Sequence, residues 1–174
     1  IVSLNLIAAL FLSAAVSYLL GSCNSSIIVV RLWKKKDVRD FGSKNAGLTN
    51  TLRCFGKGPA LFTILGDLSK GILAVLLSRL IVHLLNAGIG PDNDIRFIGY
   101  VAGFFAILGH IFPAYYGFKG GKGILVASSI LIITDPVTFC IVIPFFALIL
   151  ALTKYVSVAS ISAALAYPII TFLT

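Results

Sequence analysis

Long apolar runs constrain this chain most, because several of them are long enough to cross a lipid bilayer. Hydrophobic residues make up 59% of the 174 residues and charged residues only 11%, against about 45–50% and about 25% in soluble globular domains. In lipid, backbone polar groups must be satisfied within the segment, which favours helices. We therefore predict an all-α, polytopic transmembrane helix bundle that forms one membrane domain over residues 1–174.

The apolar runs predict about six spans. They cover residues 4–20, 59–85, 97–112, 123–134, 136–152 and 156–173. The fourth is short, because about 12 residues of helix rise only about 18 Å across a hydrocarbon core of about 30 Å. An earlier start within residues 117–123 would point this helix N-terminus into a cytoplasmic cavity, where unpaired N–H groups favour an anion.

The distribution of charge orients these spans. The net charge is +8, with a strongly basic segment at residues 31–58 and a net acidic one at residues 86–96. Positively charged loops remain in the cytoplasm, so we expect the N-terminus outside and the glycine-rich segments 42–58 and 117–123 at the cytoplasmic face. The basic charge also suits an anionic substrate or anionic lipid. Nucleic acid is disfavoured as a partner, because no folded basic domain or aromatic platform accompanies the charge.

The second glycine-rich segment, GFKGGKG at residues 117–123, is similar to a phosphate loop but is not a Walker A motif. Tyr116 occupies the position of the first required glycine, and Gly123 that of the Ser or Thr. Nucleotide binding is therefore disfavoured. We favour simple anion binding by backbone N–H groups and Lys122, and the alternative is a glycine-rich turn whose lysines only follow topology.

The first segment combines small polar side chains with an arginine. Ser43, Thr49 and Asn50 are neutral donors, and Arg53 can bind a phosphate with two parallel hydrogen bonds. The alternative is a polar loop with a helix N-cap.

Other polar residues lie within the spans. His110 lies where the third predicted span meets the loop that carries the second glycine-rich segment. A lone membrane histidine is more often a hydrogen-bonded structural residue than a catalyst. Asp67 and Lys70 are three residues apart and can pair on one helix face, so we expect them to face the bundle interior and to support the site.

The three cysteines show no metal-ligand spacing. Cys23, Cys54 and Cys140 therefore predict neither a disulfide framework nor a metal site, and we expect them to be buried. We predict no metal and no cofactor.

Four segments in order along the chain carry a family resemblance: GSKNAGLTNTLR (42–53), Gly66-Asp67 with Lys70-Gly71, GHIFPAYYGFKGGKG (109–123) and YVSVASI (155–161). They resemble motifs of the bacterial glycerol-3-phosphate acyltransferases that use acyl phosphate, the PlsY type. The resemblance implies transfer of a fatty acyl group from acyl phosphate to the 1-hydroxyl of glycerol 3-phosphate, with lysophosphatidate and phosphate as products. This reaction is the first step of phospholipid synthesis in the bacterial cell membrane. The implied partners are the two substrates and the bilayer, with the soluble enzyme that produces acyl phosphate as a further candidate.

The resemblance also implies roles for individual residues. The implied catalytic residues are Ser43, Arg53, Lys122 and Ser160, and the implied substrate- or phosphate-binding residues are Asn45, Gly47, Thr49, Asn50, His110, Lys119, Gly120, Gly121 and Gly123. Lys44 stands where the family has glycine, which matters if the position needs a positive φ. The family's seventh helix and C-terminal motif are expected beyond residue 174, so we expect a fragment or impaired activity.

Two other classes of function remain open. A transporter or channel for a phosphorylated metabolite could use the same anion sites, but it would need inverted repeats and a polar path across the bilayer. A purely structural helix bundle would leave the two basic segments unexplained.

Overall fold

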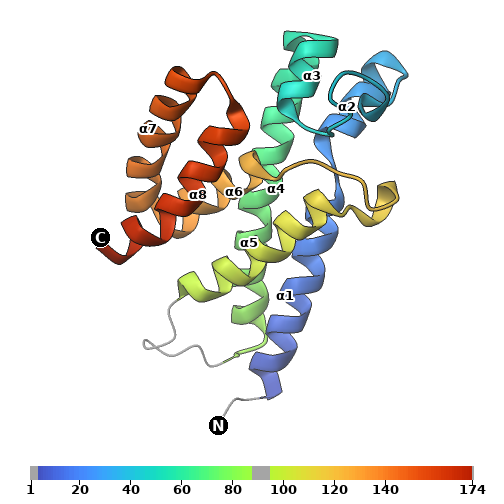
Figure 1. Ribbon diagram of the computed structural model, residues 1–174. Coiled ribbons are helices and arrows are strands. Elements are labelled where there is room, and N and C mark those ends of the chain that lie inside the picture. The colour runs from blue at the N-terminus through green and yellow to red at the C-terminus, as the bar shows by residue number, and fades with distance from the viewer. Residues whose placement is uncertain (1–3, 88–94, 174) are drawn as a thin grey trace. The chain divides into compact units, whose positions relative to one another are not determined.

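The computed structural model describes residues 4–87 and 95–173, and every regular element in these ranges is helical (Figure 1). The all-α prediction is therefore confirmed. The elements are α1 (Leu4–Ser22), α2 (Ser25–Lys34), η1 (Val38–Asp40), α3 (Leu48–Phe55), α4 (Lys57–Leu84), α5 (Ile95–Ile111), η2 (Ala114–Tyr116), α6 (Ile124–Thr134), α7 (Pro136–Thr153) and α8 (Val156–Leu173).

Within the described residues, five stretches are long and apolar enough to cross a membrane. They are Leu4–Lys34, Lys57–Leu84, Arg96–Tyr116, Pro136–Thr153 and Val156–Leu173, and α6 is a shorter apolar helix. These stretches and α6 overlap the predicted spans, and the chain is a multi-pass helical protein of the membrane type. The exact number of spans stays a prediction. The side of the membrane on which each end lies stays a prediction.

Two short helices form where the sequence predicted a loop. The α2 helix begins after Asn24, whose side chain accepts a hydrogen bond from the N–H of Ile27 and so caps the helix. The α3 helix begins after Gly47, directly within the first glycine-rich segment. The basic charge of residues 31–58 favours a loop over α3 and the end of α2, although an Asn cap before an apolar run is a start signal for α2.

The chain forms two compact units, Ile1–Ile130 and Leu131–Thr174. The prediction of one membrane domain stays a prediction. In the first unit, small residues make a buried stripe along α1 at every fourth position, formed by Ala9, Ser13, Ser17 and Gly21. This spacing lets helix backbones approach closely in lipid. The hydroxyl of Ser17 lies 3.3 Å from that of Ser78 on α4.

The α1 and α5 helices cross in direct backbone contact. A Cβ atom on Gly21 would collide with the backbone of Ala106, and one on Gly109 would collide with the backbone of Tyr18. Each helix therefore supplies a glycine at the point where the other helix passes. This contact places the C-terminal end of α1 next to that of α5, and the second glycine-rich segment follows α5 after η2.

The second unit is the antiparallel pair α7 and α8, which lie side by side in Figure 1. Asp135 caps α7 by accepting a hydrogen bond from the N–H of Thr138 at 3.2 Å, and its other oxygen lies 3.5 Å from the hydroxyl of Thr171 on α8. Large apolar side chains such as Leu152 and Leu165 are exposed on this pair, as lipid-facing residues of spanning helices are.

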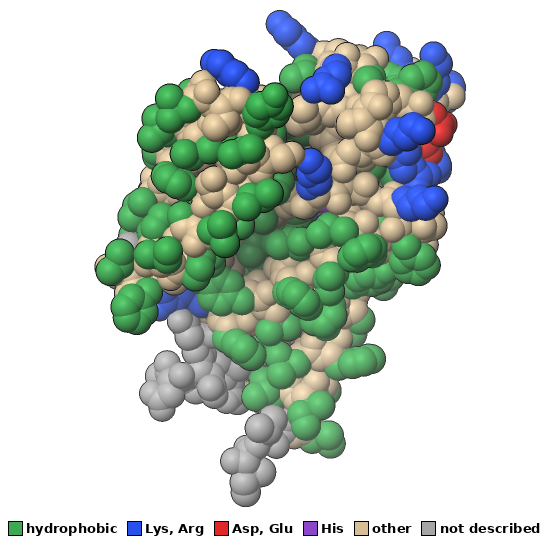
Figure 2. All heavy atoms as spheres, viewed as in Figure 1, with side chains coloured by type: hydrophobic (Ala, Val, Ile, Leu, Met, Phe, Trp, Pro, Cys, Tyr) green, Lys and Arg blue, Asp and Glu red, His purple; other side chains and the backbone are tan. Residues whose placement is uncertain are grey.

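The surface of the protein divides by chemistry. Figure 2 shows hydrophobic side chains over the outer faces of the helices, and Lys and Arg gathered at the α2–α3 end of the first unit. The expectation that the cysteines are buried is wrong, because Cys23, Cys54 and Cys140 are all exposed. A small apolar side chain is as well suited to a lipid-facing surface as to a core, so the type of residue alone does not decide between them.

Candidate functional site

Asn24 joins the break between α1 and α2 to the first glycine-rich segment. Its Oδ1 accepts hydrogen bonds from the N–H of Ile27 at 3.1 Å and from the hydroxyl of Ser26 at 2.9 Å. Its Nδ2 donates to the carbonyl of Ala46 at 3.2 Å. A single buried amide therefore starts α2 and fixes the loop that precedes α3.

Asn50 organises the same segment from within α3. Its Nδ2 donates to the carbonyls of Val38 and Phe41 at 3.1 and 3.0 Å, and its Oδ1 accepts from the N–H of Ser43 at 3.0 Å. The side chain is 1% exposed and both of its amide hydrogens are used. Phosphate binding by Asn50 stays a prediction, and the structure gives this residue the role of holding Ser43 in place.

The exposed donors of this segment lie on and just before α3. Thr49 and Arg53 are four residues apart and both exposed, so they share one face of the helix. Gly47 precedes the helix in an extended conformation, and no side chain caps its first N–H groups. Ser43 is exposed and Asn45 is half-buried. A helix N-terminus, hydroxyls and a guanidinium therefore lie close together along the chain, which suits an anion.

Lys44, which stands where the family has glycine, adopts a left-handed conformation. Its φ is 58°, and its N–H donates to the carbonyl of Phe41 at 3.0 Å. This position therefore needs a positive φ, which glycine adopts without steric cost and other L-residues adopt at about 1–2 kcal/mol.

The second glycine-rich segment folds back on the end of α5. The N–H of Gly120 donates to the carbonyl of Ile111 and that of Gly121 to the carbonyl of His110, both at 3.1 Å. A Cβ atom on Gly121 would collide with Nε2 of His110. In this structure the two glycines therefore allow close packing, and their N–H groups are already used. Substrate binding by Gly120 and Gly121 stays a prediction.

The rest of this segment leads into α6. Lys119 and Lys122 are exposed, and Gly123 is buried with a φ of 76°. The α6 helix begins at Ile124, so the earlier start considered within residues 117–123 is wrong. The positive φ of Gly123 and the packed glycines before it explain why the helix cannot extend further toward α5.

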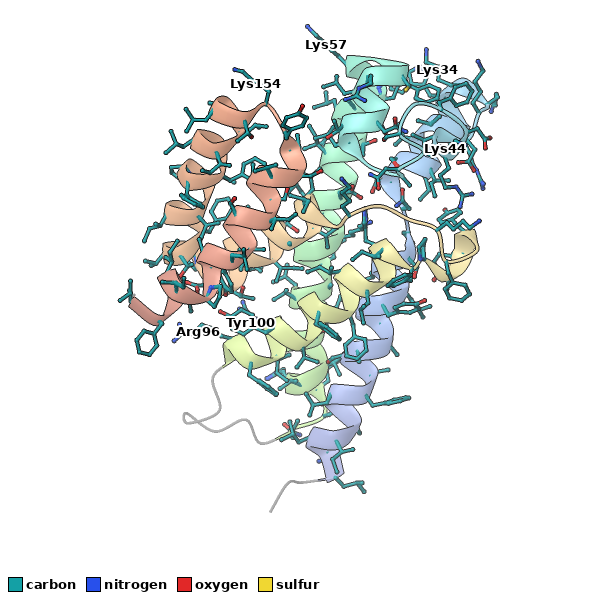
Figure 3. All side chains as sticks on the ribbon, viewed as in Figure 1. Lys34, Lys44, Lys57, Arg96, Tyr100 and Lys154 are labelled. Atoms are coloured by element: carbon teal, nitrogen blue, oxygen red, sulfur yellow. The ribbon has the colours of Figure 1, made fainter. Side chains whose placement is uncertain are left out.

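The two glycine-rich segments contact each other. The N–H of Ala46 donates to the carbonyl of Gly120 at 3.3 Å. The guanidinium of Arg39 donates to the carbonyls of Tyr116 and Lys119 at 2.7 and 3.2 Å. The two segments therefore lie at the same end of the first unit, and their location at the cytoplasmic face stays a prediction. Figure 3 shows Lys34, Lys44 and Lys57 projecting from the same end of the first unit.

A surface ionic cluster of Asp37, Arg31 and Arg39 supports this contact. Asp37 Oδ2 lies 2.6 Å from Arg31 Nη2 and 2.8 Å from Arg39 Nη2, and Asp37 Oδ1 accepts from Arg39 Nε at 2.9 Å. The hydrogen bond from the Arg39 side chain is the main cause that holds the pKa of Asp37 well below its ordinary value of 3.8. The hydrogen bond to Asp37 in turn raises the pKa of Arg39. Both groups therefore stay charged while Arg39 reaches the second segment.

A buried ionic cluster of Asp67, Lys70 and His110 lies below the two segments. Lys70 Nζ is 3.0 Å from Asp67 Oδ1 and 2.8 Å from His110 Nδ1, and it donates to the carbonyls of Gly21 and Cys23 at 3.2 and 3.1 Å. Asp67, Lys70 and His110 are 2%, 5% and 2% exposed. The predicted interior pairing of Asp67 with Lys70 is confirmed. His110 has the structural hydrogen bond expected of a lone membrane histidine, and its role in substrate binding stays a prediction.

Ser160 belongs to the second compact unit. It lies on α8, is half-buried, and its hydroxyl donates to the carbonyl of Val156 at 2.7 Å. Its catalytic role stays a prediction. Among the described residues of both units, no group of three or more His, Cys, Asp or Glu side chains is arranged to hold a metal ion.

Comparisons with known proteins agree on one family. The family model described as glycerol-3-phosphate acyltransferase matches residues 11–174. A glycerol-3-phosphate acyltransferase of Chlorobium phaeobacteroides (strain BS1) is 46% identical over 158 residues, which is 90% of this chain and 66% of that protein. One of Ureaplasma urealyticum serovar 10 is 39% identical over 162 residues, covering 91% of this chain and 64% of that protein. The chain thus spans just under two thirds of the length of these relatives.

Solved structures give the same result. The crystal structure of PlsY, an integral membrane glycerol 3-phosphate acyltransferase, in its glycerol 3-phosphate form matches with a TM-score of 0.79 and 31% identity, over 95% of this chain and 77% of that one. Its lysophosphatidic acid form matches with a TM-score of 0.76 and 29% identity, over 95% of this chain and 76% of that one.

Proposed function

Because this chain belongs to the glycerol-3-phosphate acyltransferase family, we propose that the protein transfers a fatty acyl group from acyl phosphate to the 1-hydroxyl of glycerol 3-phosphate. The products are lysophosphatidate and inorganic phosphate. The reaction takes place at the cytoplasmic face of a bacterial cell membrane, as the first step of phospholipid synthesis, and needs no cofactor. A soluble enzyme that makes acyl phosphate is the proposed source of the donor.

The observation that carries this proposal is the contact between the two basic, glycine-rich segments. It gathers exposed hydroxyls and cations at one end of the first unit, where two phosphate-bearing substrates can be bound together; these residues are Ser43, Thr49, Arg53, Lys119 and Lys122. Arg53 offers a planar donor pair to one phosphate, and Lys122 offers a point charge to the other. Two bound substrates held in this way react as if in one molecule.

The chemistry needs little from the protein beyond positioning. The 1-hydroxyl oxygen of glycerol 3-phosphate attacks the carbonyl carbon of acyl phosphate and forms the ester bond. The bond between that carbon and the phosphate oxygen breaks, and phosphate leaves with the electron pair. Because a phosphate has a second pKa near 6, the donor's own phosphate can accept the hydroxyl proton. This route suits a chain that contains no glutamate. Ser43 is the proposed donor to the acyl carbonyl.

The test is a donor comparison with purified protein in lipid. Glycerol 3-phosphate is supplied with acyl phosphate, acyl-CoA or acyl carrier protein as donor, and lysophosphatidate is followed. We expect product with acyl phosphate alone. Arg53→Ala and Lys122→Ala should each lower kcat/KM by about 10²-fold or more, because each removes a donor from a phosphate in the transition state.

Lys34→Ala is the matched control, since it removes an exposed lysine from the same basic end without touching either segment. It should leave the rate within about twofold of wild type. Absence of product with acyl phosphate, or full activity of both site variants, would contradict the proposal.

A further inference from the structure

We propose that Lys70 is a positioning residue for the substrate-binding segments, acting from the bundle interior by holding His110 in one tautomer and fixing the end of α1. The proposal rests on the proposed function, because it concerns the same site. Lys70 is 5% exposed and lies on α4, away from both segments in the sequence. It therefore affects the substrates only through the groups it contacts.

The first step of the argument is the hydrogen-bond capacity of the Lys70 ammonium. It carries three hydrogens and no acceptor. Its three neutral partners, which are the carbonyls of Gly21 and Cys23 and the Nδ1 of His110, match those three hydrogens. Asp67 Oδ1 lies 3.0 Å from Nζ but accepts no hydrogen bond of good geometry. Asp67 therefore balances the charge, and the hydrogens go to the neutral groups.

The second step is the tautomer of His110. Since an ammonium can only donate, Nδ1 of His110 accepts and carries no hydrogen, and the ring proton resides on Nε2. A Cβ atom on Gly121 would collide with both Nε2 and the carbonyl of Ala46. The protonated nitrogen of the ring therefore packs against the second segment, close to its contact with the first.

The third step is that two routes lead from Lys70 to one backbone hydrogen bond. Through His110, whose carbonyl accepts from the N–H of Gly121, Lys70 supports the turn that holds Gly120. Through the carbonyl of Cys23 it holds the residue next to Asn24, whose Nδ2 donates to the carbonyl of Ala46. The routes meet where the N–H of Ala46 donates to the carbonyl of Gly120. One interior cation thus sets the alignment of the two segments.

The carboxylate completes the cluster. A lone ammonium in the bundle interior would be costly, and Asp67, one helical turn away on α4, supplies the opposite charge at 3.0 Å. His110 Nδ1 also lies 3.7 Å from the same carboxylate oxygen. A protein that needed only a structural ion pair here would not need the ammonium to contact a histidine and the end of a second helix as well.

The test uses the fact that the chain has only two histidines, His83 and His110. In a His83→Gln background, ¹⁵N NMR of protein labelled at histidine reports the tautomer of His110 alone. We expect the Nε2–H tautomer in the parent. Lys70→Met, which keeps a long unbranched side chain and removes the ammonium, should give a mixture of His110 tautomers. Lys34→Met is the matched surface control and should leave the spectrum unchanged.

Enzyme kinetics supply the second readout. Lys70→Met should raise the KM for glycerol 3-phosphate by about tenfold and lower kcat less, because it loosens the binding segments and removes no group that touches the substrates. Lys70→Arg, which keeps a cationic donor, should recover part of this loss. An Nδ1–H tautomer in the parent, or a Lys70→Met protein with unchanged tautomer and unchanged KM, would overturn the inference. If the parent has no acyltransferase activity, the proposed function fails, and the spectra alone then decide whether Lys70 positions His110.

Discussion

The described part of the first unit contains two clusters in which one carboxylate meets cationic or imidazole side chains, and they differ in burial. In the surface ionic cluster, Asp37 accepts hydrogen bonds from two guanidinium groups. In the buried ionic cluster, Asp67 faces an ammonium whose hydrogens go to neutral groups. Water and flexible side chains let the surface cluster adapt, whereas the buried cluster must hold one geometry. The buried cluster therefore fixes His110 and the end of α1, on which the two segments pack. The surface cluster holds the carbonyls of Tyr116 and Lys119.

The largest effect should follow from removing the buried carboxylate. Asp67→Ala leaves the ammonium of Lys70 without its counter-charge, which typically costs about 3–5 kcal/mol of unfolding free energy in a buried pair. Unfolding in detergent, followed by circular dichroism, measures the loss. The double variant Asp67→Leu with Lys70→Met should recover most of it, since it removes both charges. A loss below about 1 kcal/mol in Asp67→Ala would show that the buried cluster is not tightly held.

A smaller effect should follow from removing the surface arginine that joins the two segments. Arg39→Ala breaks the hydrogen bonds to Asp37, Tyr116 and Lys119, and hydrogen bonds to charged groups contribute about 1.5–3 kcal/mol. Because this cluster is partly solvated, we expect the free energy that holds the second segment in place to fall by about 1–2 kcal/mol. Faster amide hydrogen exchange in residues 116–121 is the measurement, with Lys34→Ala as the control. Exchange as slow as in wild type would mean that Arg39 does not hold the second segment.

The smallest effect should be the pH dependence of the surface cluster. The pKa of Asp37 is lower in the folded protein than its ordinary 3.8, so its stabilising contribution is present above that value and is lost as the pH falls toward the folded value. The difference in thermal midpoint between wild type and Asp37→Asn should therefore be constant from pH 5 to 8 and shrink below about pH 4. A difference that stays constant down to pH 3 would contradict the assignment.

Much of the fold is predictable because a long, continuous apolar run in a bilayer satisfies its backbone hydrogen bonds as a helix. The run at residues 156–173 predicts the bounds of α8, and the run at 123–134 predicts α6 within one residue. The short helices α2 and α3 are harder to predict, because α2 is short and runs into the basic segment, and α3 is amphipathic and lies within it. Such short helices are marginal alone, and both pack on α4, which stabilises them.

The site is predictable in part for a related reason. The three-residue spacing of Asp67 and Lys70 predicts their pairing, because it is a local property of one helix. The contact of Lys70 with His110 is separated by 40 residues and depends on how α4 and α5 pack, which no local pattern reports. The hydrogen bonds of Asn50 to backbone carbonyls are of the same kind. For Lys70 and Asn50 the sequence indicates a polar role but does not identify these hydrogen-bond partners.

The left-handed backbone of Lys44 has a consequence for preorganisation. A glycine at this position would lose more backbone conformations on folding than a lysine does. The lysine therefore has a steric penalty in the folded loop but a smaller loss of conformational entropy on folding. The loop is thereby restricted before any ligand arrives, and less ordering is left for the binding step. An unfavourable residue for the turn can in this way favour the phosphate binding that we propose for this loop.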